Sequence, residues 1–101
     1  MSDTIEKLVK TIRSRKGSDI KSSYTAHLLS NGNDYCFNKL KEEVVELENA
    51  IKNKKNTIHE TADVIYHLLV TLESAGVNFD DIIKEIQKRE GTSGFEEKKN
   101  R

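Results

Sequence analysis

The chain has 101 residues, enough for one domain with a modest hydrophobic core, and we expect residues 1–101 to form that single domain. Lys and Arg together number 17, as do Asp and Glu, so no net charge attracts the protein to nucleic acid or to an anionic membrane. Its apolar runs are too short to span a bilayer, no signal-peptide pattern is visible, and Cys36 is the single cysteine. These features predict a cytoplasmic protein without internal disulfides, in which Cys36 packs in the core.

The first part of the chain predicts two helices. The chain has no proline, and its five glycines fall between periodic apolar segments, which is typical of an all-helical protein. Apolar residues recur at helical spacing from near Asp3 to about Lys16. After a loop, Ser23 can cap a short second helix that ends at Asn31-Gly32.

The middle of the chain predicts a pair of longer helices. Asp34 is expected to cap a third helix over roughly 35–52, whose apolar residues form one seam of Phe37, Leu40, Val44, Leu47 and Ile51. A fourth helix should run from Thr57, which can form a capping box with Glu60, to about Ala75. The short turn at 53–56 makes the two helices antiparallel. The fourth helix is apolar on nearly all sides, so we expect it to be central and packed in part by a second subunit.

The last part predicts a fifth helix and a tail. Asn78 and the acidic residues that follow it suit the start of a helix that continues to about Arg89, and residues 90–101 are polar and glycine-interrupted. The predicted fold is therefore an all-α antiparallel bundle of about five helices, completed by homodimerisation, with a polar C-terminal tail.

Acidic residues gather in the stretch KLKEEVVELE, residues 39–48, and again near the start of the fourth helix. Glu43 and Glu46 are three residues apart and so share a helix face, as do Glu60 and Asp63. Helical geometry places Glu43 beside the apolar seam and Glu42 almost opposite it. Because the two helices are antiparallel, the two pairs are expected to face each other.

Carboxylates gathered at a partly buried site repel one another, so they either take up protons or hold a cation. Oxygen ligands without thiolate or imidazole favour Mg²⁺ or Mn²⁺, and Mg²⁺ readily shares phosphate oxygens, so a polyphosphate substrate and hydrolysis are indicated. The alternative interpretation is a solvated helix face with ordinary ion pairs such as Glu48 with Lys52, in a helical dimerisation module without catalytic activity.

Motifs along nearly the whole chain resemble one enzyme family. The resemblance is carried by Arg15, Ser23-Tyr24-Thr25-Ala26, Leu28-Leu29, Gly32, Lys39-x-x-Glu42-Glu43-x-x-Glu46, Ala50, Glu60-x-x-Asp63, Tyr66-His67, Arg89 and Gly94-x-x-Glu97-Lys98-x-x-Arg101. The sequence is similar in these motifs to the phosphoribosyl-ATP pyrophosphohydrolases of histidine biosynthesis, within the all-helical MazG-type nucleoside triphosphate pyrophosphatase superfamily. Lys41 departs from the glycine usual before the paired glutamates, which concerns local packing.

The resemblance implies a homodimeric, Mg²⁺-dependent hydrolase that converts phosphoribosyl-ATP to phosphoribosyl-AMP and pyrophosphate, the second step of histidine biosynthesis. It implies that Glu43, Glu46, Glu60 and Asp63 are catalytic and hold the metal, with Glu42 as a weaker candidate ligand. Many relatives are fused to the enzyme of the following step, so association with that enzyme is a further expectation. The alternative within the superfamily is a pyrophosphatase that acts on nucleotides such as dCTP or dUTP.

The same resemblance suggests residues that bind substrate, each with a structural alternative. Ser23 can instead cap a helix, Tyr24 can pack in the core, and His67 can be a hydrogen-bonded core histidine. The residues near the C-terminus can equally belong to a solvated tail. The candidates for substrate binding are Arg15, Ser23, Tyr24, Thr25, Lys39, Tyr66, His67, Arg89, Lys98 and Arg101.

Overall fold

The structure is a computed structural model, and it describes residues 3–91 and 94–99. Within these residues every regular element is a helix, which confirms the predicted all-α class. The helices are α1 (Asp3–Ser14), α2 (Tyr24–Ser30), α3 (Gly32–Asn53), α4 (Thr57–Ser74), α5 (Phe79–Arg89) and α6 (Gly94–Lys99). Among the described residues, none of these helices combines the length and the apolar character needed to cross a membrane.

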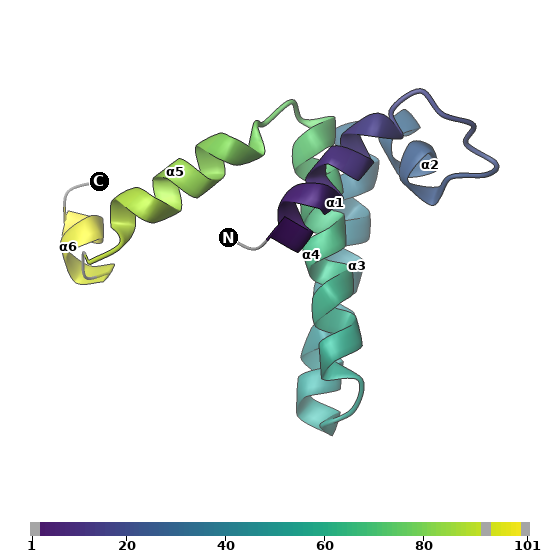
Figure 1. Cartoon of the computed structure of the whole chain (residues 1–101). Coiled ribbons are helices and arrows are strands. Elements are labelled where there is room, and N and C mark those ends of the chain that lie inside the picture. The colour runs from purple at the N-terminus through teal and green to yellow at the C-terminus, as the bar shows by residue number, and fades with distance from the viewer. Residues whose placement is uncertain (1–2, 92–93, 100–101) are drawn as a thin grey trace.

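The centre of the fold is the long antiparallel hairpin of α3 and α4 (Figure 1). Its turn is tight because Lys54 and Asn56 both adopt left-handed backbone conformations, with φ of 53° and 61°. At the opposite end of the hairpin, α1 packs against α4, and α2 packs against both α3 and α4. The hairpin therefore presents side chains of α3 and α4 to each other along most of its length.

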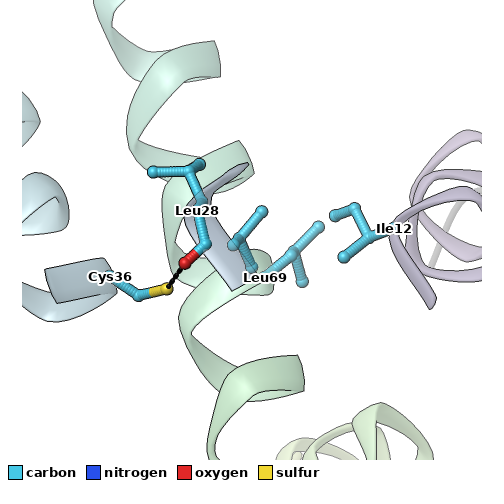
Figure 2. Close-up of a cluster of buried hydrophobic side chains, with 5 residues drawn as sticks. Ile12, Leu28, Cys36 and Leu69 are labelled. Carbon is cyan, nitrogen blue, oxygen red and sulfur yellow. Dashed lines mark hydrogen bonds between the residues drawn. The ribbon is translucent and has the colours of Figure 1, made fainter. Parts of the chain in front are cut away.

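The buried core lies where α1, α2, α3 and α4 meet. Its residues are Ile12, Leu28, Cys36, Leu69 and Val70 (Figure 2). The Cys36 thiol donates a hydrogen bond to the carbonyl oxygen of Leu28 at 3.2 Å, which confirms the packing role expected for this cysteine.

Two of the predicted helix caps are present. The Ser23 hydroxyl accepts a hydrogen bond from the backbone N–H of Ala26 at 3.1 Å, and the Asn78 side chain accepts one from Asp80 at 2.9 Å. The predicted cap at Asp34 is wrong, because α3 begins earlier, at Gly32, which has a φ of 86°.

The capping box predicted for Thr57 and Glu60 is also wrong. The N-cap of α4 is Asn56, and the Thr57 hydroxyl donates instead to the carbonyl oxygen of Ala50 at 3.3 Å across the hairpin. The side chain of Glu60 is therefore not committed to capping α4.

The predicted apolar seam of α3 is only partly buried. Leu40 is buried, but the exposed fractions of Phe37, Val44 and Ile51 are 50%, 48% and 57%. The other buried residues of α3 are Cys36 and Ala50, which lie to one side of the seam on the helix surface.

Helices α5 and α6 project away from the hairpin as an arm (Figure 1). Residues 94–99 of the expected polar tail form a short helix, α6, which the composition did not indicate. The radius of gyration is 15.5 Å, against about 13 Å for a compact domain of this length. A single chain thus leaves apolar surface on both the hairpin and the arm without cover.

Candidate functional site

The acidic side chains of α3 and α4 converge in the half of the hairpin that lies nearer its turn. Carboxylate oxygens of Glu43, Glu46 and Glu60 all lie within 4.8 Å of one another. A second group with the same spacing consists of His59, Glu60 and Asp63. The two groups share Glu60, so the structure brings together the four carboxylates predicted from the sequence. We refer to Glu43, Glu46, Glu60 and Asp63 as the carboxylate cluster.

The electrostatics of the carboxylate cluster favour a bound cation. Oε2 of Glu43 and Oε2 of Glu60 are both buried and have no hydrogen-bond partner in the described part of the chain. Burial, and next the nearby Glu46 carboxylate, raise the pKa of both groups above the ordinary range for glutamate. Buried acceptors without donors are costly, and a divalent cation supplies the missing positive partner. The oxygen-rich donor set fits Mg²⁺ or Mn²⁺.

The remaining glutamates of KLKEEVVELE lie outside the carboxylate cluster. Glu42 is exposed and forms an ion pair with Lys39 at 3.3 Å, and this contact raises the pKa of Lys39. Glu48 pairs with Lys52 at 3.8 Å on the solvent side of α3. The geometry therefore separates Glu43 from Glu42, as helical spacing predicts.

The start of α2 lies against α4 on one side of the cluster. The Tyr24 hydroxyl is 3.2 Å from Nε2 of His67, and the hydroxyls of Thr25 and Tyr66 are hydrogen-bonded to each other. Nδ1 of His67 is 2.9 Å from the carbonyl oxygen of Asp63. The ring of Tyr66 contacts the rings of Tyr24 and His67, which joins the two pairs. The four candidate substrate-binding residues thus form one network that reaches the carboxylate cluster through the backbone of Asp63.

Two members of this network differ in how exposed they are to solvent. His67 is buried, with an exposed fraction of 6%, and both of its ring nitrogens have partners, as expected for a hydrogen-bonded core histidine. Tyr24 keeps an exposed fraction of 54%, so one side of its ring is open to a ligand. Burial is the main reason that the pKa of Tyr24 is raised.

Other candidate residues are not brought to the cluster within one chain. Arg15 is exposed in the turn after α1. Arg89, which forms an ion pair with Glu85 at 3.3 Å, and Lys98 lie on the projecting arm (Figure 1). Arg101 lies outside the described residues.

Sequence reasoning missed several residues beside the cluster. Nε2 of His59 lies 3.3 Å from Oδ2 of Asp63, and the spacing of four residues on one helix could have revealed this contact. Near the hairpin turn, Asn49, Asn53 and Lys55 line a hollow together with Glu46 and Glu60. No sequence spacing indicated this hollow, because it depends on the conformation of the turn.

Known proteins match this chain over most of its length. The family model described as phosphoribosyl-ATP pyrophosphohydrolase matches residues 5–90. The chain is 43% identical over 96 residues to a phosphoribosyl-ATP pyrophosphatase of Rhodobacter capsulatus, with 93% of each chain covered. It is 43% identical over 101 residues to the phosphoribosyl-ATP pyrophosphatase of Dechloromonas aromatica, covering 98% of this chain and 94% of the relative.

A longer relative also matches. The chain is 40% identical over 99 residues to a histidine biosynthesis bifunctional protein of Wolinella succinogenes, covering 96% of this chain and 43% of that protein. The family match spans the four carboxylates of the cluster and the network around His67. The chain therefore belongs to the phosphoribosyl-ATP pyrophosphohydrolase family.

Proposed function

We propose that this chain is a hydrolase that converts phosphoribosyl-ATP to phosphoribosyl-AMP and pyrophosphate in the second step of histidine biosynthesis. The observation that carries the proposal is the convergence of four carboxylates from α3 and α4 in a member of this family. Related proteins named for this activity match nearly the whole chain, which supports the same substrate.

The carboxylate cluster is the proposed metal site. Glu43, Glu46, Glu60 and Asp63 would hold Mg²⁺, with Mn²⁺ as an alternative, and Glu42 is left to its ion pair with Lys39. When bound, the cation neutralises charge on the phosphoanhydride and helps to activate water. The buried, unpartnered oxygens of Glu43 and Glu60 support this assignment.

The protein's own groups then have distinct proposed roles. A carboxylate of the cluster accepts the proton of the attacking water, and because these groups are coupled the proton belongs to the set as a whole. Tyr24, Thr25 and Tyr66 contact the nucleoside part of the substrate, while His67 holds Tyr24 in place. Arg89 and Lys98 could bind the polyanionic substrate only from another chain, given where the arm lies.

The active form is proposed to be a homodimer in the cytoplasm. An almost entirely apolar groove of about 460 Å³ lies between α3 and α4, and we call it the apolar groove. Its lining residues are Phe37, Leu40, Lys41, Val44, Val45, Val64 and Leu68. A second copy would cover these side chains and restore the compactness that one chain lacks. The bifunctional relative supports a further proposal, that this chain associates with the enzyme of the next step.

The test is to incubate the purified protein with phosphoribosyl-ATP and Mg²⁺ and to identify the products. The proposal requires pyrophosphate and phosphoribosyl-AMP in equal amounts. Turnover of dCTP or dUTP without turnover of phosphoribosyl-ATP would assign the chain to the alternative pyrophosphatase activity. Release of orthophosphate, or no turnover of any nucleotide, would reject the proposal.

A further inference from the structure

A polar hollow extends from the carboxylate cluster towards the hairpin turn. It is a hollow open to solvent with a volume of about 290 Å³, the space of roughly ten water molecules in the liquid, which is large enough to admit a diphosphate. Glu46 and Glu60 form its wall on the side of the cluster. The rest of its lining is Asn49, Ala50, Asn53, Lys55 and Asn56. We refer to this space as the hairpin pocket.

The turn between α3 and α4 contributes Lys55 and Asn56 to the hairpin pocket. Lys54 and Asn56 hold left-handed φ values of 53° and 61°, a conformation that costs free energy for residues with a Cβ atom. The N–H of Lys55 donates to the carbonyl oxygen of Ala50 at 3.1 Å, and the Thr57 hydroxyl donates to the same oxygen at 3.3 Å. These bonds fix the turn, and Lys55 lines the pocket while Lys54 does not.

Four exposed side chains of the hairpin pocket carry N–H donors that the protein itself does not use. In the part of the chain that the structure describes, the side chains of Asn49, Asn53, Lys55 and Asn56 form no hydrogen bond or ion pair with another residue. A lysine ammonium has three N–H donors, and each asparagine amide has two. Such a set suits the oxygens of a phosphate group, and the ammonium adds the charge that strengthens those bonds.

We propose that the hairpin pocket binds the terminal diphosphate of the substrate, the part that leaves as pyrophosphate, with Lys55 as its principal ligand and the asparagine amides as further donors. This inference rests on the proposed function and assigns the direction of the substrate along the hairpin. The pocket shares Glu46 and Glu60 with the cluster, so a group held there is adjacent to the phosphate at the metal.

The opposite side of the cluster is chemically different. There Tyr24, Tyr66 and His67 offer stacked or edge-on rings with centroids 5.1 to 6.4 Å apart. Aromatic faces and hydroxyls suit a base and a sugar better than they suit a diphosphate. The substrate would therefore run from α2, across the carboxylate cluster, to the hairpin turn.

Direct binding of inorganic pyrophosphate tests this assignment without any turnover. We would titrate pyrophosphate into the full-length protein by calorimetry in the presence of Mg²⁺, and titrate Mg²⁺ alone in parallel. Lys55→Ala should weaken pyrophosphate binding roughly tenfold, because a charge-assisted hydrogen bond is lost, and Lys55→Arg should restore part of it. Lys54→Ala removes the same charge from the neighbouring residue and should leave pyrophosphate affinity unchanged. Mg²⁺ affinity should be the same in all three variants.

Any other result would overturn the assignment of the diphosphate to the hairpin pocket. An equal loss of pyrophosphate affinity in Lys54→Ala and Lys55→Ala would show a general charge effect, and no loss in Lys55→Ala would show that the pocket does not bind the diphosphate. Titration of phosphoribosyl-AMP distinguishes the other phosphate source: if Lys55→Ala weakens only this ligand, the pocket holds one of the two monophosphate groups of phosphoribosyl-AMP instead. Because pyrophosphate binding needs no catalysis, failure to hydrolyse phosphoribosyl-ATP would reject the proposed function separately.

Discussion

The hydroxyl of Tyr24 lies 3.2 Å from Nε2 of the buried His67 and ties the first turn of α2 to the interior of α4. Nδ1 of the same ring lies 2.9 Å from the carbonyl oxygen of Asp63. A carbonyl oxygen can only accept a hydrogen bond, so the proton is on Nδ1 and Nε2 accepts from the Tyr24 hydroxyl in the neutral ring. The position of Tyr24 is thereby coupled to the helical turn that presents Asp63 to the cluster.

We expect Tyr24→Phe to lower the free energy of unfolding by about 1 kcal/mol, because Nε2 of the buried His67 loses its donor. Urea denaturation measures this change. A double-mutant cycle of Tyr24→Phe with His67→Leu isolates the pair and should give a coupling energy of similar size. Tyr35→Phe is the control, because the Tyr35 hydroxyl contacts His27 instead. A coupling energy near zero for Tyr24 and His67 would contradict the interpretation.

Glu42 and Glu43 are adjacent in sequence and provide a matched pair of substitutions. Glu43→Gln should reduce kcat/KM by at least about 100-fold and abolish the rise in Tm that Mg²⁺ produces, because it neutralises a carboxylate of the cluster whose Oε2 is buried. Glu42→Gln breaks only an exposed ion pair with Lys39 and should retain most of both properties. Steady-state kinetics and thermal melts with and without Mg²⁺ check this. Equal losses in the two variants would place Glu42 in the metal site as well.

In the metal-free protein, the contribution of Glu43 and Glu60 to stability should decline as the pH rises from about 4.5, the ordinary glutamate pKa, through the raised pKa of each group in the folded state. The pKa of each is raised in the folded state, so the folded protein binds more protons than the unfolded chain. This contribution is fully present below the unfolded pKa and is lost as the pH passes the folded pKa. Urea denaturation in the presence of EDTA measures this contribution when the wild type is compared with a Glu43→Gln/Glu60→Gln variant across the pH range. Parallel stability curves for the two proteins would refute the prediction.

Local patterns in the sequence predicted most of the helices and the pairing of the acidic residues in the site. Ser23 and Asn78 were identifiable as caps because each precedes a periodic apolar segment, and the i, i+3 spacing placed Glu43 with Glu46 and Glu60 with Asp63. The helical angle also separated Glu43 from Glu42, which the ion pair of Glu42 with Lys39 agrees with.

Features that depend on tertiary contacts were not predictable in this way. Thr57 had the right spacing from Glu60 for a capping box, but the nearby carbonyl of Ala50 takes its hydrogen bond across the hairpin. The seam of α3 was correctly apolar, yet periodicity does not say which neighbour covers it, and Phe37 and Val44 remain half exposed. Likewise the hairpin pocket includes Lys55 and Asn56 of a turn in which two residues adopt left-handed conformations, and the sequence pattern did not indicate these conformations.

The half-exposed residues of the apolar groove lead to a prediction about assembly. Val45 has an exposed fraction of 55% and lines the groove, so a second copy that covers it would bury the side chain. Val45→Glu would place a charge without a partner in that interface and should raise the dimer dissociation constant by at least about 100-fold. Sedimentation velocity over a range of concentrations measures the change, and circular dichroism confirms that the variant remains helical. Ser22→Glu, on an exposed loop, is the control for one added negative charge. If the wild type is a monomer at micromolar concentration, or if Val45→Glu dimerises as well as the wild type, the apolar groove is not the dimer interface.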